Sequence, residues 1–179
     1  MRFFAFILIA LLAGCGGVTA PEPRAFDLGL NAPSTGLPAV RISSVRSVAP
    51  FDSVEMHYRL AWRNASEIAA FANSRWAATP GEMFRKQLLR AAREGNGKCT
   101  LGIEIQEFTQ VFAAKAESDA RIELRVALSA GSKTLSRNFT VVESNAGSDA
   151  VSGAAAFARA ADRATGEIGR WIAAQPDCR

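Results

Sequence analysis

The feature that most constrains the fold of this chain is the strict alternation within residues 121–128, RIELRVAL. A period of two is typical of a β-strand that buries one face in a core and exposes the other to water. The chain must therefore supply another element to cover the apolar face of the sheet that this strand belongs to. The apolar positions of the stretch are Ile122, Leu124, Val126 and Leu128.

That cover is predicted near the C-terminus, where Ser148 can cap a long helix and Pro176 ends it. Apolar residues recur there at helical spacing, and the charged residues Arg159, Arg163 and Glu167 lie outside their stripe. The many alanines would let this helix approach a sheet closely, and we expect Trp171 to lie in the core. The stripe consists of Ala154, Phe157, Ala161, Ala164, Ile168 and Trp171.

A second helix is predicted over residues 80–94. Thr79 can cap it, Pro80 suits the first helical position, and Glu82 completes a capping box. Gly95 is a plausible stop. Phe84, Leu88 and Ala91 then share the face that the helix buries.

The other elements read as strands. Ala130–Lys133 is a hairpin-like turn, and Leu135, Phe139 and Val141 form the next inward set. A shift of apolar parity predicts a β-bulge near Gln106-Glu107. We therefore expect an α+β fold in which a mostly antiparallel sheet carries two helices on one face, in the order strands, helix, three strands, helix. The further strand segments are residues 25–30, 40–48, 54–62, 67–76 and 101–108. The alanines within residues 67–76 leave a helix possible there.

The N-terminus reads as an export signal. Met1-Arg2 precedes a short apolar run over residues 3–13, which is too short to cross a bilayer. Leu12-Ala13-Gly14-Cys15 resembles a bacterial lipobox, and this resemblance implies that Cys15 carries lipid and becomes the first mature residue. Gly16 is not the aspartate that retains many such proteins in the inner membrane, so we expect the periplasmic face of the outer membrane.

The chain then divides into three parts. Residues 1–14 are the expected signal peptide, residues 15–24 a lipidated tether rich in Gly and Pro, and residues 25–179 one domain. Several acyl chains on one cysteine hold a protein firmly to a membrane.

Two cysteines remain once Cys15 is assigned to lipid. Cys99 and Cys178 lie in a compartment that permits disulfides, and we predict that they pair. Two free thiols are the alternative. With one histidine in the chain, no zinc-ligand spacing appears, and we expect no metal and no cofactor.

The sequence gives little support to catalysis or to nucleic-acid binding. The net charge is +4 and is spread along the chain without a basic run. His57 falls on the expected wet face of a strand, and neither a G-x-S-x-G elbow nor a phosphate loop appears. We expect a non-enzymatic binding or assembly domain.

Three stretches in order resemble the ABC-type transport auxiliary lipoproteins, the family of the PqiC-like proteins. They are NSRWAATPGEMFRKQLLRA at residues 73–91, EFTQVF at 107–112, and SRNFTV at 136–141 with the later GRWIAA. The resemblance implies an outer-membrane-anchored auxiliary subunit that works with an MCE-domain protein and ABC transporter subunits in lipid transport. It also allows a ring of identical copies around a partner.

Arg75 and Trp76 are the candidate partner-binding residues, because Arg and Trp are enriched in interface hot spots. The alternative is that Trp76 closes the core and Arg75 pairs with an acid. Two other functions stay open: a periplasmic lipid chaperone that holds an acyl chain in a cleft between the helices and the sheet, and a small hydrolase.

Overall fold

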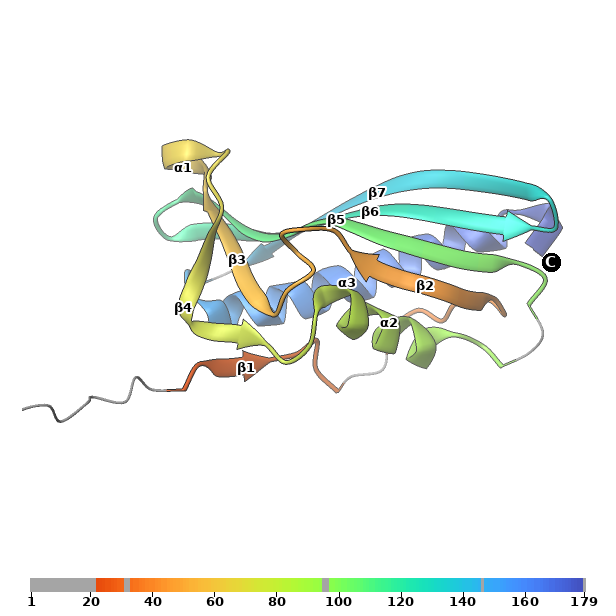
Figure 1. The fold of residues 1–179 in the computed structure, drawn as a ribbon, viewed down its shortest axis with the longest axis horizontal. Coiled ribbons are helices and arrows are strands. Elements are labelled where there is room, and N and C mark those ends of the chain that lie inside the picture. The colour runs from red at the N-terminus through yellow and green to blue at the C-terminus, as the bar shows by residue number, and fades with distance from the viewer. Residues whose placement is uncertain (1–21, 31–32, 95–96, 146, 179) are drawn as a thin grey trace, which may run out of the picture.

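A computed structural model describes residues 22–30, 33–94, 97–145 and 147–178. The expected signal peptide, Cys15 and the expected helix stop at Gly95 lie outside these residues. The described chain folds into one seven-stranded sheet with its two long helices on the same face (Figure 1). The strands are β1 (Arg24–Phe26), β2 (Arg41–Ser47), β3 (Glu55–Leu60), β4 (Ala69–Trp76), β5 (Thr100–Ala114), β6 (Glu117–Ala130) and β7 (Lys133–Asn145). The helices are α1 (Ala61–Asn64), α2 (Pro80–Ala91), α3 (Ala150–Ala173) and a 3₁₀ turn η1 (Pro176–Cys178).

The sheet is mixed, which corrects the expectation of a mostly antiparallel one. Its strand order is β1-β4-β3-β5-β6-β7, and β2 also pairs with β5. The pairs β3–β4, β5–β6 and β6–β7 are antiparallel, whereas β1–β4, β2–β5 and β3–β5 are parallel. Parallel pairs require a crossover, and the segment that contains α2 supplies it between β3 and β5. Alternating hydrophobicity marks a strand but not its direction, so the sequence pattern did not reveal these pairs.

The β5–β6–β7 ribbon follows the sequence pattern closely. Register shifts between Ile105 and Glu107, which places the bulge where the parity change predicted it. The β6–β7 turn contains Gly131 at φ +59°, a left-handed conformation that suits glycine. One inward assignment is wrong: Leu135 is 47% exposed because it lies on the edge strand β7, whereas its partner Leu128 on β6 is 2% exposed.

Helix α2 begins as its sequence predicts and ends three residues early. Thr79 accepts a hydrogen bond from Glu82 N, and the Glu82 side chain accepts from Thr79 N, which is the expected capping box. The helix stops at Ala91 because the chain there turns to pair with Leu37. Leu37 N donates to Ala91 O (2.7 Å), and Arg93 N donates to Leu37 O (3.1 Å).

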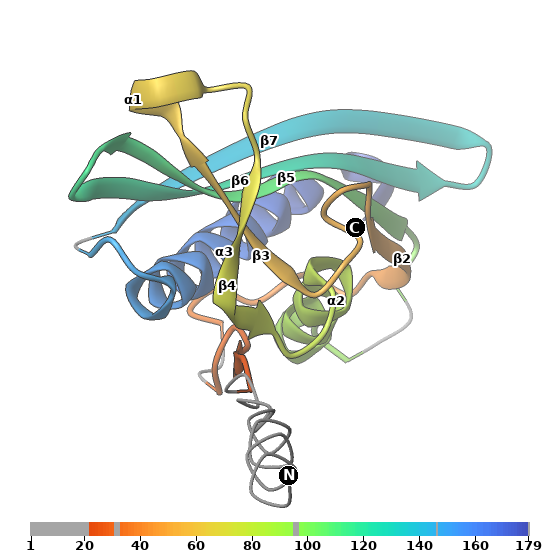
Figure 2. The same ribbon diagram turned by 60° about the vertical axis from the view of Figure 1, so that its left-hand side comes forward.

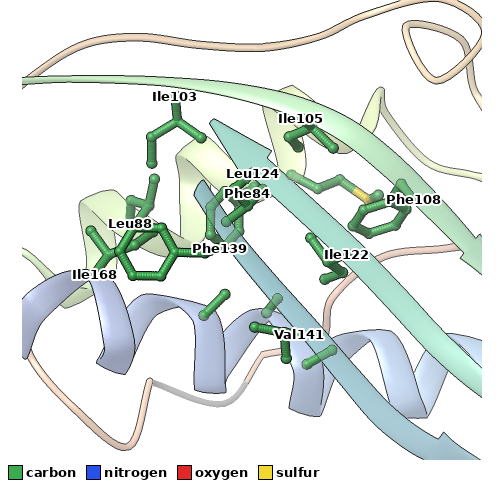
Figure 3. Packing of buried hydrophobic residues seen from close by; sticks show 14 of the residues in the cluster. Phe84, Leu88, Ile103, Ile105, Phe108, Ile122, Leu124, Phe139, Val141 and Ile168 are labelled. Carbon is green, nitrogen blue, oxygen red and sulfur yellow. The ribbon is translucent and has the colours of Figure 1, made fainter. Parts of the chain in front are cut away.

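Helix α3 covers β6 and β7, while α2 lies against β2. Its N-cap is Asp149 and not Ser148, because the Asp149 carboxylate accepts from Ser152 N at 2.8 Å. Trp171 is half-buried and packs edge-on against Phe139. Side chains from the sheet and both long helices fill the space between them, as the labelled residues in Figure 3 show.

Candidate functional site

Trp76 belongs to the core, which corrects its assignment as a partner-binding residue. Its side chain is 1% exposed and lies edge-on to Phe108 and Phe157, with ring centroids 5.4 and 5.3 Å away. Phe108 and Phe157 stack on each other at 4.3 Å. These three rings join β4, β5 and α3, so Trp76 stabilises the fold and has no surface to offer a partner.

Arg75, one residue earlier on β4, points the other way and is exposed. Its guanidinium lies 3.9 Å from the Glu22 carboxylate, which is itself almost fully exposed. An exposed pair at this distance contributes little to stability. The pairing of Arg75 with an acid matches the alternative reading of the sequence.

His57 is buried, which corrects its expected place on a wet face. Its side chain is 6% exposed because the loop before β3 folds back and sets Phe51 edge-on to the imidazole at 5.6 Å. Its Nε2 lies 3.3 Å from the Glu55 carboxylate. The hydrogen bonds of Ser43 and Ser53 go to other groups and not to His57.

Cys99 and Cys178 form a disulfide, with 5.2 Å between their Cα atoms. The bond joins the residue before β5 to η1, at the C-terminal end of α3. It ties the C-terminal segment to the sheet.

The open face of the sheet is polar and ion-paired. Arg59 binds Glu107 through two hydrogen bonds of 2.8 and 3.1 Å, and Arg121 binds Glu123 at 2.6 Å. Glu104 pairs with Arg46 across β2 and β5. Each of these three carboxylates has an arginine partner, so none of them is set up as a free general acid or base.

A groove of about 420 Å³ runs between α2 and the turn after β1. Leu28, Ala78 and Met83 supply apolar walls, and Lys86 and Arg90 lie along α2. Arg90 Nη1 donates to Gly29 O at 3.0 Å, which fastens the turn to the helix. The groove is a surface feature and does not enter the filled space between the helices and the sheet.

Another hollow, of about 270 Å³, lies beside α1 where β3 and β5 end, and it is lined largely by aromatic rings. We call it the aromatic slot. The slot has no counterpart in the sequence prediction, because the alternation over residues 54–62 placed Trp62 in a strand, whereas the chain turns into α1 after Leu60. The crowding of three aromatic residues into positions 58–71 was the available signal. The slot is lined by Tyr58, Leu60, Trp62, Phe71, Phe112, Lys115 and Ser148.

No cluster of three or more His, Cys, Asp and Glu side chains among the described residues is placed to hold a metal ion. No helix in the same parts of the chain combines the length and apolar character needed to cross a membrane.

Comparison with known proteins identifies the fold alone. No family model and no curated protein matches the chain. A crystal structure of a Xanthomonas campestris protein, described by the family model DUF330, superimposes with a TM-score of 0.66 at 22% identity and covers 84% of this chain and 91% of its own. A second crystal structure, of a protein described as uncharacterized, gives a TM-score of 0.68 at 13% identity over 85% of this chain and 99% of its own. The same fold therefore makes up nearly the whole chain of these two other proteins.

Proposed function

We propose that this protein is a lipid-anchored, non-catalytic auxiliary subunit of an ABC/MCE-type lipid transport system, held at the periplasmic face of the outer membrane. In this role the lipid on Cys15 fixes the protein to the membrane, and the folded domain contacts an MCE-domain protein. The domain therefore acts by docking and brings no reactive group to a substrate.

The observation that carries the proposal is the lipobox at Leu12–Cys15, which lies only nine residues before β1 at Arg24. An extended chain of that length spans roughly 30 Å. Such a tether keeps the domain close to the membrane that holds the lipid. The three stretches that resemble the auxiliary lipoproteins fall largely within β4, α2, β5, β7 and the end of α3, so they are spread from the first half of the domain to its C-terminal helix.

A periplasmic lipid chaperone is the second candidate, and the groove beside α2 favours it. Its volume of about 420 Å³ falls within the range of small-molecule sites, and apolar walls alternate there with the two cations Lys86 and Arg90 and the two carboxylates Asp27 and Glu82. The cleft expected between the helices and the sheet is a weaker location, because the described side chains there pack into one core.

The deciding experiment is immunoprecipitation of the intact lipoprotein from its native membranes, with proteins and lipids identified by mass spectrometry. Cys15→Ala is the matched control, because it removes the acylated residue and leaves the domain unchanged. We expect an MCE-domain protein and ABC transporter subunits with the wild type, and loss of the protein from the membrane fraction with C15A. Stoichiometric phospholipid without those subunits would replace the proposal with the chaperone.

A further inference from the structure

The aromatic slot exists because α3 begins too late to cover the whole apolar face of the sheet. Gln110 faces the first turn of α3, where an added Cβ on Gly153 would lie 2.2 Å from its side-chain oxygen. Phe112 lies two residues further along β5 on the same face, beyond the start of the helix at Ala150. Ser148, which precedes α3, forms one wall of the slot.

Aromatic rings form the floor and the rim of the slot, and Phe112 on its floor is itself 5% exposed. The Tyr58 ring lies 4.8 Å from that of Phe71 and 6.0 Å, edge-on, from that of Phe112. Trp62 stands at the rim on α1 and is 46% exposed. Tyrosine, tryptophan and phenylalanine at an exposed hollow are the residue types that dominate the centres of protein interfaces.

Lys115 adds a charge to the apolar lining. It is the charged residue among those that line the slot, and it is exposed. None of the ion pairs in the described parts of the chain involves it. An apolar hollow beside an unpaired ammonium group is complementary to an apolar side chain that has a carboxylate next to it.

The position of the slot suits a partner that approaches the domain from the side away from the membrane. In both views α1 projects from the side of the molecule opposite β1, where the described chain begins (Figures 1 and 2). The tether to Cys15 joins the domain at the β1 end. The α1 wall of the slot therefore lies on the side of the molecule opposite the β1 end, where the tether joins.

We propose that the aromatic slot is the docking site for a segment of a partner protein that carries a bulky apolar side chain beside an Asp or Glu. At about 270 Å³ the slot is smaller than typical ligand-enclosing pockets and fits a side-chain anchor better than an acyl chain. The partner's carboxylate meets Lys115, and its apolar group packs on Tyr58 and Trp62. This inference rests on the proposed function, since it assigns the surface by which the auxiliary subunit docks.

Site-specific photo-cross-linking in cells tests the assignment. p-Benzoylphenylalanine replaces Trp62 in the intact lipoprotein, and Leu135, which is equally exposed at 47%, carries the same probe as the control. We expect a protein adduct from position 62 and none from position 135. The cross-linked peptide should contain an acidic residue next to the modified apolar one. Adding Lys115→Glu should reduce the adduct about tenfold, and Lys115→Arg should retain it.

Other outcomes overturn the docking site. They are an adduct on phospholipid, an adduct on a second copy of this chain, equal labelling at positions 62 and 135, or indifference to K115E. Thermal denaturation of the probe-bearing variants checks that each is folded. A mapped, Lys115-dependent adduct on a protein outside the MCE and ABC classes would support the slot and contradict the proposed function. Co-purification of an MCE-domain protein without an adduct at position 62 would support the proposed function and contradict the slot as the docking site.

Discussion

At the scale of single residues, α3 and β5 pack closely where Gly153 faces Gln110. An alanine Cβ at position 153 would lie 2.2 Å from Gln110 Oε1 and 2.9 Å from its Cδ. Gln110 is fully buried, and its amide donates to Ser118 Oγ at 2.9 Å, so it has little room to move. In an ordinary helix interior, Gly→Ala stabilises by about 1 kcal/mol. Here we expect Gly153→Ala to lower the free energy of unfolding by about 1–3 kcal/mol, measured by urea denaturation.

The second half of that test is a double-mutant cycle with Gln110→Ala, which removes the atoms that a Cβ at position 153 would meet. In the Gln110→Ala background, Gly153→Ala should cost less than it does in the wild type, or should stabilise. A Gly153→Ala variant as stable as the wild type would show that the two elements are not in close contact here.

The sequence pattern did not predict the burial of residues that segments distant in the sequence cover. Trp76 and Arg75 differ by one position on β4, and only the arrangement of β5 and α3 decides which of them meets the core. His57 has the right parity for a wet face and is nevertheless buried, because Phe51 covers it from a loop. Alternation reports the two faces of a strand, but not what else folds over them.

At the scale of elements, the N-cap of α3 makes the stability of the fold depend on pH. Hydrogen bonds from the Ser152 hydroxyl and then from its backbone N–H hold the pKa of Asp149 below its ordinary value of 3.8. A lowered folded-state pKa means that the carboxylate stabilises the fold at pH values above its unfolded pKa. This contribution is lost as the pH falls through the folded pKa.

We therefore expect Asp149→Ala to lower the denaturation midpoint at pH 7, and the gap from the wild type to narrow below pH 3.8. Asp149→Asn is the matched control, since it can cap the helix but does not titrate. The difference in denaturation midpoint between Asp149→Asn and Asp149→Ala should therefore stay nearly constant from pH 7 to below pH 3.8. A gap between wild type and Asp149→Ala that is unchanged at low pH would contradict the capping role of the charge.

Features that depend on residues close in sequence could be predicted, whereas features that depend on distant segments could not. The capping box of α2 and the bulge and turn of the β5–β6–β7 ribbon depend on residues close in sequence, and all three appear where expected. The end of α2 does not, because Leu37 pairs with the chain at Ala91 from more than fifty residues away. The parallel pairing of β2 and β3 with β5 is likewise set by long connections.

At the scale of the whole molecule, composition and order predicted an α+β domain with helices on one face, and the structure contains it. The aromatic slot could not be predicted in the same way. Its walls come from four segments between residues 58 and 148, and it opens only because α3 starts after residue 149. A site that opens because a helix begins too late to cover a strand leaves no periodic pattern in the sequence.

The last prediction concerns the disulfide, which closes a long covalent loop in the chain. Cys99 and Cys178 are 79 residues apart, and a loop of about 80 residues stabilises by on the order of 4 kcal/mol in the chain-entropy model. We expect Cys178→Ala, measured in the non-acylated Cys15→Ala background, to lower the free energy of unfolding toward that amount. Cys178 is the residue to replace, since Cys99 is fully buried and its loss would also leave a cavity.

Reduction with dithiothreitol supplies the matched measurement, since it should bring the Cys15→Ala protein to the stability of the Cys15→Ala/Cys178→Ala variant and leave that variant unchanged. Thiol titration of the unfolded, unreduced Cys15→Ala protein should find no free thiol. Two free thiols, together with a stability that does not respond to dithiothreitol, would contradict the bond. The C-terminal segment would then be held to the sheet by the packing of α3 alone, and Cys178→Ala should cost little.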